Sequence, residues 1–132
     1  MSFLLDTDIC SIHTKDDRVL FPRFMQHLGQ LHVSAVTVGE LSTWANRLNA
    51  SARRKQTIER LLSDVVILEV DRDVANRFGI LRASVLDRGL FIATADGFIA
   101  ATALVYDLTL VTRNTRDFTS VPNLRLADWL MP

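Results

Sequence analysis

The sequence lacks the features that would mark it for a membrane or an oxidising compartment. No apolar run approaches the roughly 20 residues of a membrane-spanning helix. No basic segment followed by a long apolar stretch marks a secretory signal at the N-terminus. Cys10 is the single cysteine, which excludes an internal disulfide and suits a reducing cytoplasm. We therefore expect a cytoplasmic protein with no membrane association, in which Cys10 is a small buried hydrophobe.

Other absences narrow the chemistry. The five glycines are scattered singly, so no Gly-rich loop is present to cradle phosphates, which argues against an NTPase. The three histidines lack paired spacing, and with one cysteine they disfavour a zinc site. No nucleophile-elbow motif supports Ser-His-Asp catalysis. The formal net charge is zero, so the chain lacks the overall basic character of many nucleic-acid binders.

Apolar segments of two kinds alternate along the chain. Its 132 residues, 48% of them hydrophobic, suit one compact domain spanning 1–132. Helix-like stretches between strand-like ones favour right-handed βαβ crossovers and hence an α/β fold with a parallel sheet. The strand-like segments are 2–5, 32–36, 65–70, 108–112 and a short 124–126, and the helix-like ones are 18–28, 37–48, 54–62, 73–87 and 98–105. We expect 65–70 to be a buried strand and 98–105 a deeply buried helix.

Four carboxylates stand where separate apolar segments end or begin. Asp6 follows SFLL, Glu40 lies just beyond LHVSAV, Asp96 opens GFIAATAL, and Asp117 lies just beyond LTLVT. A parallel sheet gathers its strand ends along one edge, where open α/β folds bind ligands. Acids brought together there repel one another unless a cation neutralises them. An all-oxygen cluster suits Mg²⁺, with Mn²⁺ as the alternative.

Each acid also has an ordinary structural interpretation. Asp6 at a strand end forms an Asx-turn or caps the next helix. The segment 37–40 matches a capping box, in which Glu40 bonds back to the start of its helix. Asp96 suits the first turn of a helix, beside the positive end of the dipole, and Asp117 suits a turn. The joint arrangement, rather than any single position, supports the metal site.

Cations gather in two places along the chain. Only Lys15 and Lys55 are lysines, and the other cations of the chain are arginines. Arginine is the better bidentate phosphate ligand, so both groups could contact phosphates; a solvated helix face or loop is the alternative. The two groups of cations are Arg47, Arg53, Arg54, Lys55 and Arg60, and then Arg113 and Arg116 close to Asp117.

Two apolar features have two possible interpretations. Trp44 and the segment 21–25 are either partner surface or core packing of amphipathic helices.

Four segments together resemble a known family. FLLDTDIC at 3–10, VSAVTVGEL at 33–41, ADGFIAATAL at 95–104 and LVTRNTRDF at 110–118 are similar to the motifs of PIN domains, above all VapC-like toxins of bacterial toxin–antitoxin pairs. The resemblance runs essentially from end to end. It implies a three-layer α/β/α sandwich around a central parallel sheet and Mg²⁺-dependent endoribonuclease activity. It also implies a homodimer and a small cognate antitoxin protein.

The resemblance assigns roles to particular residues. The family's metal-site and catalytic acids correspond to Asp6, Glu40 and Asp96, and the acid of its fourth motif to Asp117. Thr112 and Asn114 correspond to polar residues near that site, and we expect Arg113 and Arg116 to contact RNA phosphates. Two positions depart from the family pattern. Asp8 adds a fifth carboxylate near the metal, and Gly97 replaces a larger residue, which we expect to loosen the start of its helix.

The expected reaction is hydrolysis of an RNA phosphodiester by a metal-activated water, leaving 5′-phosphate and 3′-hydroxyl ends. Two alternatives stay open. One is a catalytically inactive PIN-like binding module. The other is a haloacid-dehalogenase-like phosphatase, with Asp6 as nucleophile and Asp8 as acid and base. That chemistry needs a lysine after a suitable strand end, and neither Lys15 nor Lys55 meets this condition.

Overall fold

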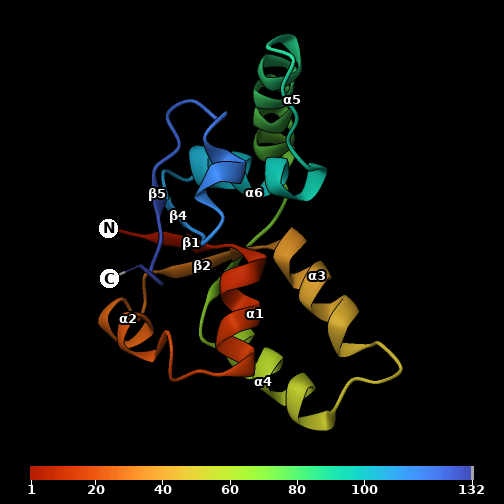
Figure 1. The fold of residues 1–132 in the computed structure, drawn as a ribbon, viewed down its shortest axis with the longest axis vertical. Coiled ribbons are helices and arrows are strands. Elements are labelled where there is room, and N and C mark those ends of the chain that lie inside the picture. The colour runs from red at the N-terminus through yellow and green to blue at the C-terminus, as the bar shows by residue number, and fades with distance from the viewer. Residues whose placement is uncertain (132) are drawn as a thin grey trace.

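A five-stranded parallel sheet lies at the centre of the computed structural model, which describes residues 1–131 (Figure 1). The strand order is β3-β2-β1-β4-β5, and all four pairings are parallel. The strands are β1 (Phe3–Leu5), β2 (Leu31–Ser34), β3 (Val66–Leu68), β4 (Thr109–Val111) and β5 (Leu126–Ala127).

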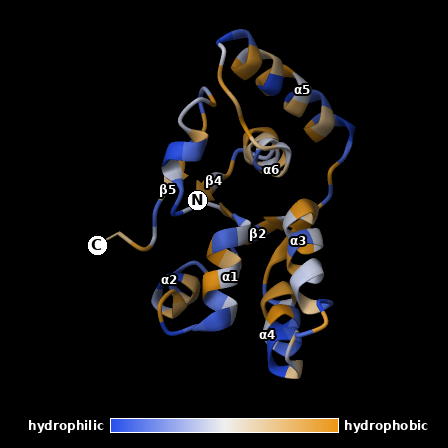
Figure 2. Cartoon of the chain, turned by 45° about the vertical axis from the view of Figure 1, so that its right-hand side comes forward, coloured by the Kyte–Doolittle hydropathy of each residue, from blue (hydrophilic) through white to orange (hydrophobic). Residues whose placement is uncertain are grey.

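Helices cover both faces of this sheet, as the resemblance implied, with α1 to α4 on one face and α5 and α6 on the other (Figure 1). In Figure 2, hydrophilic and hydrophobic residues alternate along α4 and α5. The helices are α1 (Thr7–Lys15), α2 (Phe21–Gln26), α3 (Ala35–Ala45), α4 (Ala52–Ser63), α5 (Arg72–Asp87) and α6 (Thr94–Val105), with a 3₁₀ turn η1 at Thr115–Phe118.

Alternation along β1 divides the core into two clusters. Phe3 and Leu5 pack with Ile9 of α1 and Leu41 of α3 on one face. Leu4 points to the other face, where α5 and α6 supply the second cluster. Because side chains of a strand alternate between faces, three consecutive apolar residues are what a strand covered on both sides requires.

The start of α3 differs from the expectation for 32–36 and 37–48. Ser34 is the N-cap, and its hydroxyl accepts a hydrogen bond from the N–H of Val36 at 3.1 Å. The strand therefore ends at Ser34 and the helix begins two residues earlier than predicted. The capping-box interpretation of 37–40 is wrong, because Glu40 lies in the second turn of α3.

Two further boundaries were wrong in part. The predicted helix at 18–28 shortens to α2, which starts with a proline in its first turn, a position where the missing N–H costs nothing. The segment 65–70 does contain β3, but β3 is an edge strand rather than a buried one. Val66 and Ile67 are 51% and 40% exposed.

Helix α6 begins at Thr94, four residues before the start of the predicted helix at 98–105. It is buried as expected: Ile99, Ala100, Ala101 and Ala103 have almost no exposed surface. Cys10 is likewise fully buried and free, and burial raises the pKa of its thiol. Across residues 1–131, no helix combines the length and the apolar character needed to cross a membrane.

Gly97 permits a close approach between α5 and α6. A Cβ at this position would lie 2.7 Å from Cε1 of Phe78, whose ring stacks on Phe98 with centroids 3.9 Å apart. Gly97 is buried, and at every other glycine an added Cβ would meet no atom within 4 Å. The glycine therefore has a packing role, and it does not merely loosen the helix start.

Gly97→Ala should lower the free energy of unfolding by about 1–3 kcal/mol, because the Phe78 ring must move. Gly79→Ala, on the exposed side of α5, is the matched control and should gain about 0.5–1 kcal/mol from helix propensity. Urea unfolding of both variants and of the Gly97→Ala/Phe78→Leu double mutant measures the effect. A Gly97→Ala variant as stable as the parent, or a cost unchanged by Phe78→Leu, would contradict this packing role.

Candidate functional site

The strand order reverses between β1 and β4. The chain proceeds outward from β1 through β2 to β3, then returns to place β4 and β5 on the other side of β1. The carboxyl ends of β1 and β4 flank this switch point, which is where open α/β sheets bind ligands. Asp6 directly follows β1, and its N–H donates to the carbonyl of Val111 in β4 at 3.1 Å.

Asp6 caps a helix and is also buried. Its Oδ1 caps α1 by accepting a hydrogen bond from the N–H of Ile9 at 2.8 Å. Its side chain is also almost fully buried, with 5% of the residue exposed. The cap interpretation is therefore confirmed, and it is compatible with a position at the switch point.

The acids are close enough to influence one another's ionisation. Burial raises the pKa of Asp6 to about 6, and repulsion by Asp8 and Asp96 adds to this, while the Thr112 side chain and the Ile9 N–H oppose it. Burial also raises the pKa of Asp96, with further repulsion from Asp117, Glu40 and Asp8. All four predicted acids, and Asp8 with them, therefore belong to one electrostatic cluster.

No cation of residues 1–131 forms an ion pair with this cluster. Within residues 1–131 the ion pairs closer than 4 Å are Arg18 with Asp16 and Arg125 with Asp107, and neither involves these five acids. In the described residues the carboxylates therefore have no cationic partner within 4 Å, and a bound divalent cation would relieve the repulsion between them.

Glu40 is held by a residue that the sequence analysis did not single out. The hydroxyl of Thr7 donates to Oε1 of Glu40 at 2.6 Å and lies 3.1 Å from the hydroxyl of Thr37. Thr7 is the first residue of α1 and is buried. The sequence signal that could have identified Thr7 is its position between Asp6 and Asp8, where β1 ends and α1 begins.

The remaining predicted residues come from α6 and the segment after β4. Asp96 lies in the first turn of α6, near the positive end of the helix dipole. Asp117 is exposed in η1. The Thr112 hydroxyl accepts from the N–H of Asn114 at 3.0 Å, and the Asn114 side-chain amide donates to Asp8. The fifth carboxylate is thus tied to the segment after β4.

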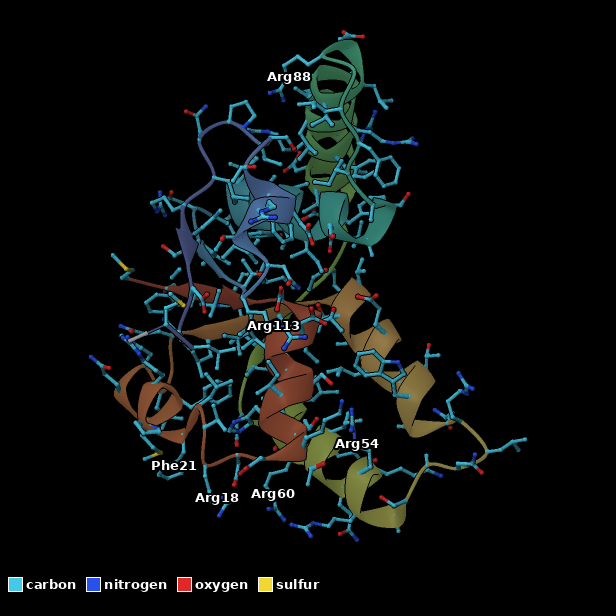
Figure 3. The ribbon with its side chains drawn as sticks, viewed as in Figure 1. Arg18, Phe21, Arg54, Arg60, Arg88 and Arg113 are labelled. Atoms are coloured by element: carbon cyan, nitrogen blue, oxygen red, sulfur yellow. The ribbon has the colours of Figure 1, made fainter. Side chains whose placement is uncertain are left out.

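The two arginines of this segment are both exposed. Arg113 lines a groove together with Asp8, and Figure 3 shows it beside the first turns of α1. Arg116, in η1, has no ion-pair partner within 4 Å among residues 1–131.

The donor set fits a hard divalent cation by its chemistry. All members are carboxylates, and they have raised pKa values where they are most buried. The side chains do not already form a complete ligand sphere: in the described chain no three Asp, Glu, His or Cys residues are arranged to hold one ion.

A parallel α/β sheet with acids gathered at its switch point defines the class of the protein. The chain belongs to the PIN domain family, whose model matches residues 3–124. Within this family it is 33% identical over 130 residues to the tRNA(fMet)-specific endonuclease VapC of Shigella flexneri, covering 98% of each chain.

Solved structures give the same result. The DNA-bound VapBC structure from Salmonella typhimurium matches with a TM-score of 0.90 at 28% identity, covering 98% of each chain. A toxin–antitoxin complex from Klebsiella pneumoniae matches with a TM-score of 0.77 at 26% identity, covering 97% of this chain and 98% of the other. The predicted family and the predicted three-layer fold are confirmed.

The burial of Asp6, together with the nearby acids, predicts an unusual dependence of stability on pH. The folded state binds a proton at Asp6 with a pKa of about 6, above the usual value of 3.8. In the metal-free protein, therefore, stability should fall as pH rises from about 4 to about 6 and stay reduced above that. Asp6→Asn should remove this slope and be more stable than the parent at pH 7 by about 1–3 kcal/mol.

Urea unfolding in EDTA at pH 5, 6 and 7 measures this slope. Asp6→Ala is the control for the cap, because it also removes the charge but loses the bond to Ile9, and it should be about 1 kcal/mol less stable than Asp6→Asn. A parent protein that gains stability between pH 5 and 7 would refute the raised pKa.

Proposed function

We propose that this chain is a divalent-metal-dependent endoribonuclease and the toxin of a cytoplasmic toxin–antitoxin pair. One observation carries the proposal: acids from four separate segments, Asp6, Glu40, Asp96 and Asp117, form one cluster at the switch point, and Asp96 is repelled by two of the others. The PIN domain match and the similarity to an RNA-cleaving VapC support it.

Asp6 and Asp96 are the direct metal ligands in this proposal, because they are the two acids whose pKa values burial raises. Glu40 and Asp117 hold water around the ion or a second ion. Mg²⁺, or Mn²⁺ in its place, supplies a Lewis acid for a phosphate oxygen and lowers the pKa of a water molecule. Thr7 fixes the orientation of Glu40, and the cap to Ile9 fixes that of Asp6.

Water, rather than the RNA 2′-hydroxyl, is the nucleophile in this proposal. Cleavage through the 2′-hydroxyl is typically assisted by a general acid and base such as a histidine pair. The three histidines of this chain are occupied elsewhere: His13 stacks on Phe24, His27 on Trp129, and Nδ1 of His32 lies 3.2 Å from the carbonyl of Phe3. Hydrolysis by water leaves a 5′-phosphate and a 3′-hydroxyl.

The partner in this proposal is a small antitoxin protein, and the toxin itself is a homodimer. The similarity to a Klebsiella pneumoniae toxin–antitoxin complex supports the first point. Exposed apolar side chains on β3 and on the α5–α6 connection give surface for protein contacts, among them Val66, Ile67 and Phe91.

An inactive binding module is the alternative of a different class. A scaffold has no reason to keep buried carboxylates in mutual repulsion, and calorimetric titration with MgCl₂ separates the two functions: the scaffold would give no heat of binding. The phosphatase alternative is weakened, because Asp8 of α1 accepts a hydrogen bond from Asn114 and no lysine in residues 1–131 pairs with Asp6.

Asp6→Asn and Asp96→Asn should each lower RNA cleavage more than about 100-fold, since each removes a ligand charge from the cluster. Cleavage of total RNA in Mg²⁺, followed by analysis of fragment ends, measures both activity and chemistry. Asp107→Asn is the matched control: Asp107 is exposed, pairs only with Arg125, and its backbone φ of 55° suits asparagine. Equal activity in Asp6→Asn and parent, or 2′,3′-cyclic phosphate ends, would refute the proposal.

Thr7→Val should lower kcat about 10- to 100-fold with little change in KM, because it frees Glu40 without touching the RNA. Thr7→Ser keeps the hydroxyl and should retain most activity. Steady-state kinetics on a labelled RNA compare the two, and circular dichroism checks that both remain folded. Similar rates for the valine and serine variants would show that the bond to Glu40 does not matter for catalysis.

A further inference from the structure

A groove leads away from the acid cluster along α1. It has a volume of about 820 Å³ and lies between α1, the end of α3 and the start of α4. Asp8 and Arg113 line it at the acid end, and Lys15, Trp44, Arg47 and Arg54 line it further along. In Figure 3, Arg113 lies beside the first turns of α1, and Arg54 lies further down, next to α4.

The groove and the acid cluster are continuous. Asp8 lines the groove, and its charge also raises the pKa values of Asp6 and Asp96. On α3, Trp44 follows Glu40 by four residues, so both lie on one face of the helix, separated by about 6 Å along its axis. A ligand reacting at the acids would therefore extend into the groove within one helical turn.

The groove is positively charged although the chain as a whole is neutral. Lys15, Arg47, Arg54 and Arg113 line it, against the one carboxylate of Asp8. None of these four cations has a carboxylate within 4 Å in the part of the chain that the structure describes. A concave surface lined by unpaired charge of one sign concentrates ligands of the opposite sign.

Trp44 and Arg54 lie next to each other in this groove. The guanidinium carbon of Arg54 lies 5.8 Å from the centroid of the Trp44 ring. Its Nη2 makes one long bond of 3.4 Å to the hydroxyl of Ser11, and its Nε is buried without a partner. Trp44 itself is 36% exposed. Aromatic rings and guanidinium planes are the surfaces on which unpaired nucleobases stack.

We propose that this groove binds a single-stranded RNA segment adjoining the cleaved phosphate, with a base stacked at the Trp44–Arg54 pair and phosphates on Arg47, Arg54 and Arg113. The inference rests on the proposed ribonuclease function and assigns Trp44, Arg47 and Arg54 to binding the RNA beside the cleaved phosphate. A duplex does not fit, because its bases are already stacked on one another and cannot reach Trp44. An acidic protein segment would match the charge of the cations. A segment that is not cleaved, however, does not need a groove that is continuous with the metal-binding acids.

Kinetics of cleavage test the stacking. Trp44→Ala should raise KM for a single-stranded RNA about tenfold or more, with a smaller change in kcat. Trp44→Phe keeps an aromatic face and should stay close to the parent. Unchanged KM in Trp44→Ala, in a protein that cleaves RNA, would overturn the groove assignment and leave the ribonuclease function standing.

Salt dependence of binding tests the phosphate contacts. In the full-length Asp6→Asn variant, which binds without cutting, the logarithm of affinity for a labelled single-stranded oligonucleotide should fall linearly with the logarithm of salt concentration. Arg47→Ala and Arg54→Ala should each reduce the slope by about 0.7. Lys55→Ala is the matched control, because Lys55 is an exposed cation on α4 outside the groove, and it should leave the slope unchanged. Equal effects of Arg54→Ala and Lys55→Ala would contradict the assignment.

Tryptophan fluorescence separates the occupants and does not depend on cleavage. Single-stranded RNA should quench the Trp44 emission of the Asp6→Asn variant, and the quenching should vanish in Asp6→Asn/Trp44→Phe, which keeps buried Trp129. Duplex RNA should quench little. Quenching by a peptide of Asp and Glu residues but not by RNA would overturn the proposal in favour of a protein occupant. Quenching by RNA in a parent that cuts no RNA would support the groove and refute the nuclease; neither quenching nor cleavage would refute both.

Discussion

Burial of one carboxylate beside several others is the constraint on which the rest of the site depends. Parallel pairing of β1 with both β2 and β4 places Asp6 at the switch point and buries it. Burial alone would favour a neutral acid, and the charges of Asp8 and Asp96 increase that preference. The fold tolerates this because Asp6 also caps α1, so the residue that destabilises the charged cluster stabilises a helix in the same place.

A neutral chain can still present a polyanion-binding surface, because its charges are segregated. Carboxylates gather at the ends of β1 and in the first turn of α6, while unpaired cations line the adjoining groove. Summed over the whole molecule these charges cancel. In the proposed function, the local charges form a site for a metal ion and a separate surface for phosphates, and a bound metal ion would connect the two. Net charge therefore says little about what this protein binds.

Features of the fold and the site were predictable where the sequence signal was local, that is, where it lay within a few neighbouring residues. Asp6 and Asp96 were located correctly relative to their elements because strand ends and helix starts are written in a few neighbouring residues. Glu40 was assigned to the wrong helix turn, because Ser34 and Thr37 both make acceptable caps and only the three-dimensional path of β2 selects Ser34. The exposure of Val66 depends on strand order, and an apolar run is the same in an edge strand as in a central one. Thr7 went unnoticed because its partner, Glu40, is 33 residues away.

Gly97 and Phe78 together determine how deeply α6 sits against α5, and Asp96 is the neighbour of Gly97. The ring of Phe78 occupies the volume that a side chain at 97 would need. The two positions are therefore coupled sterically. A relative with a larger residue at position 97 needs a smaller residue at position 78, because otherwise Asp96 would be displaced. In an alignment of relatives, the two positions should therefore covary.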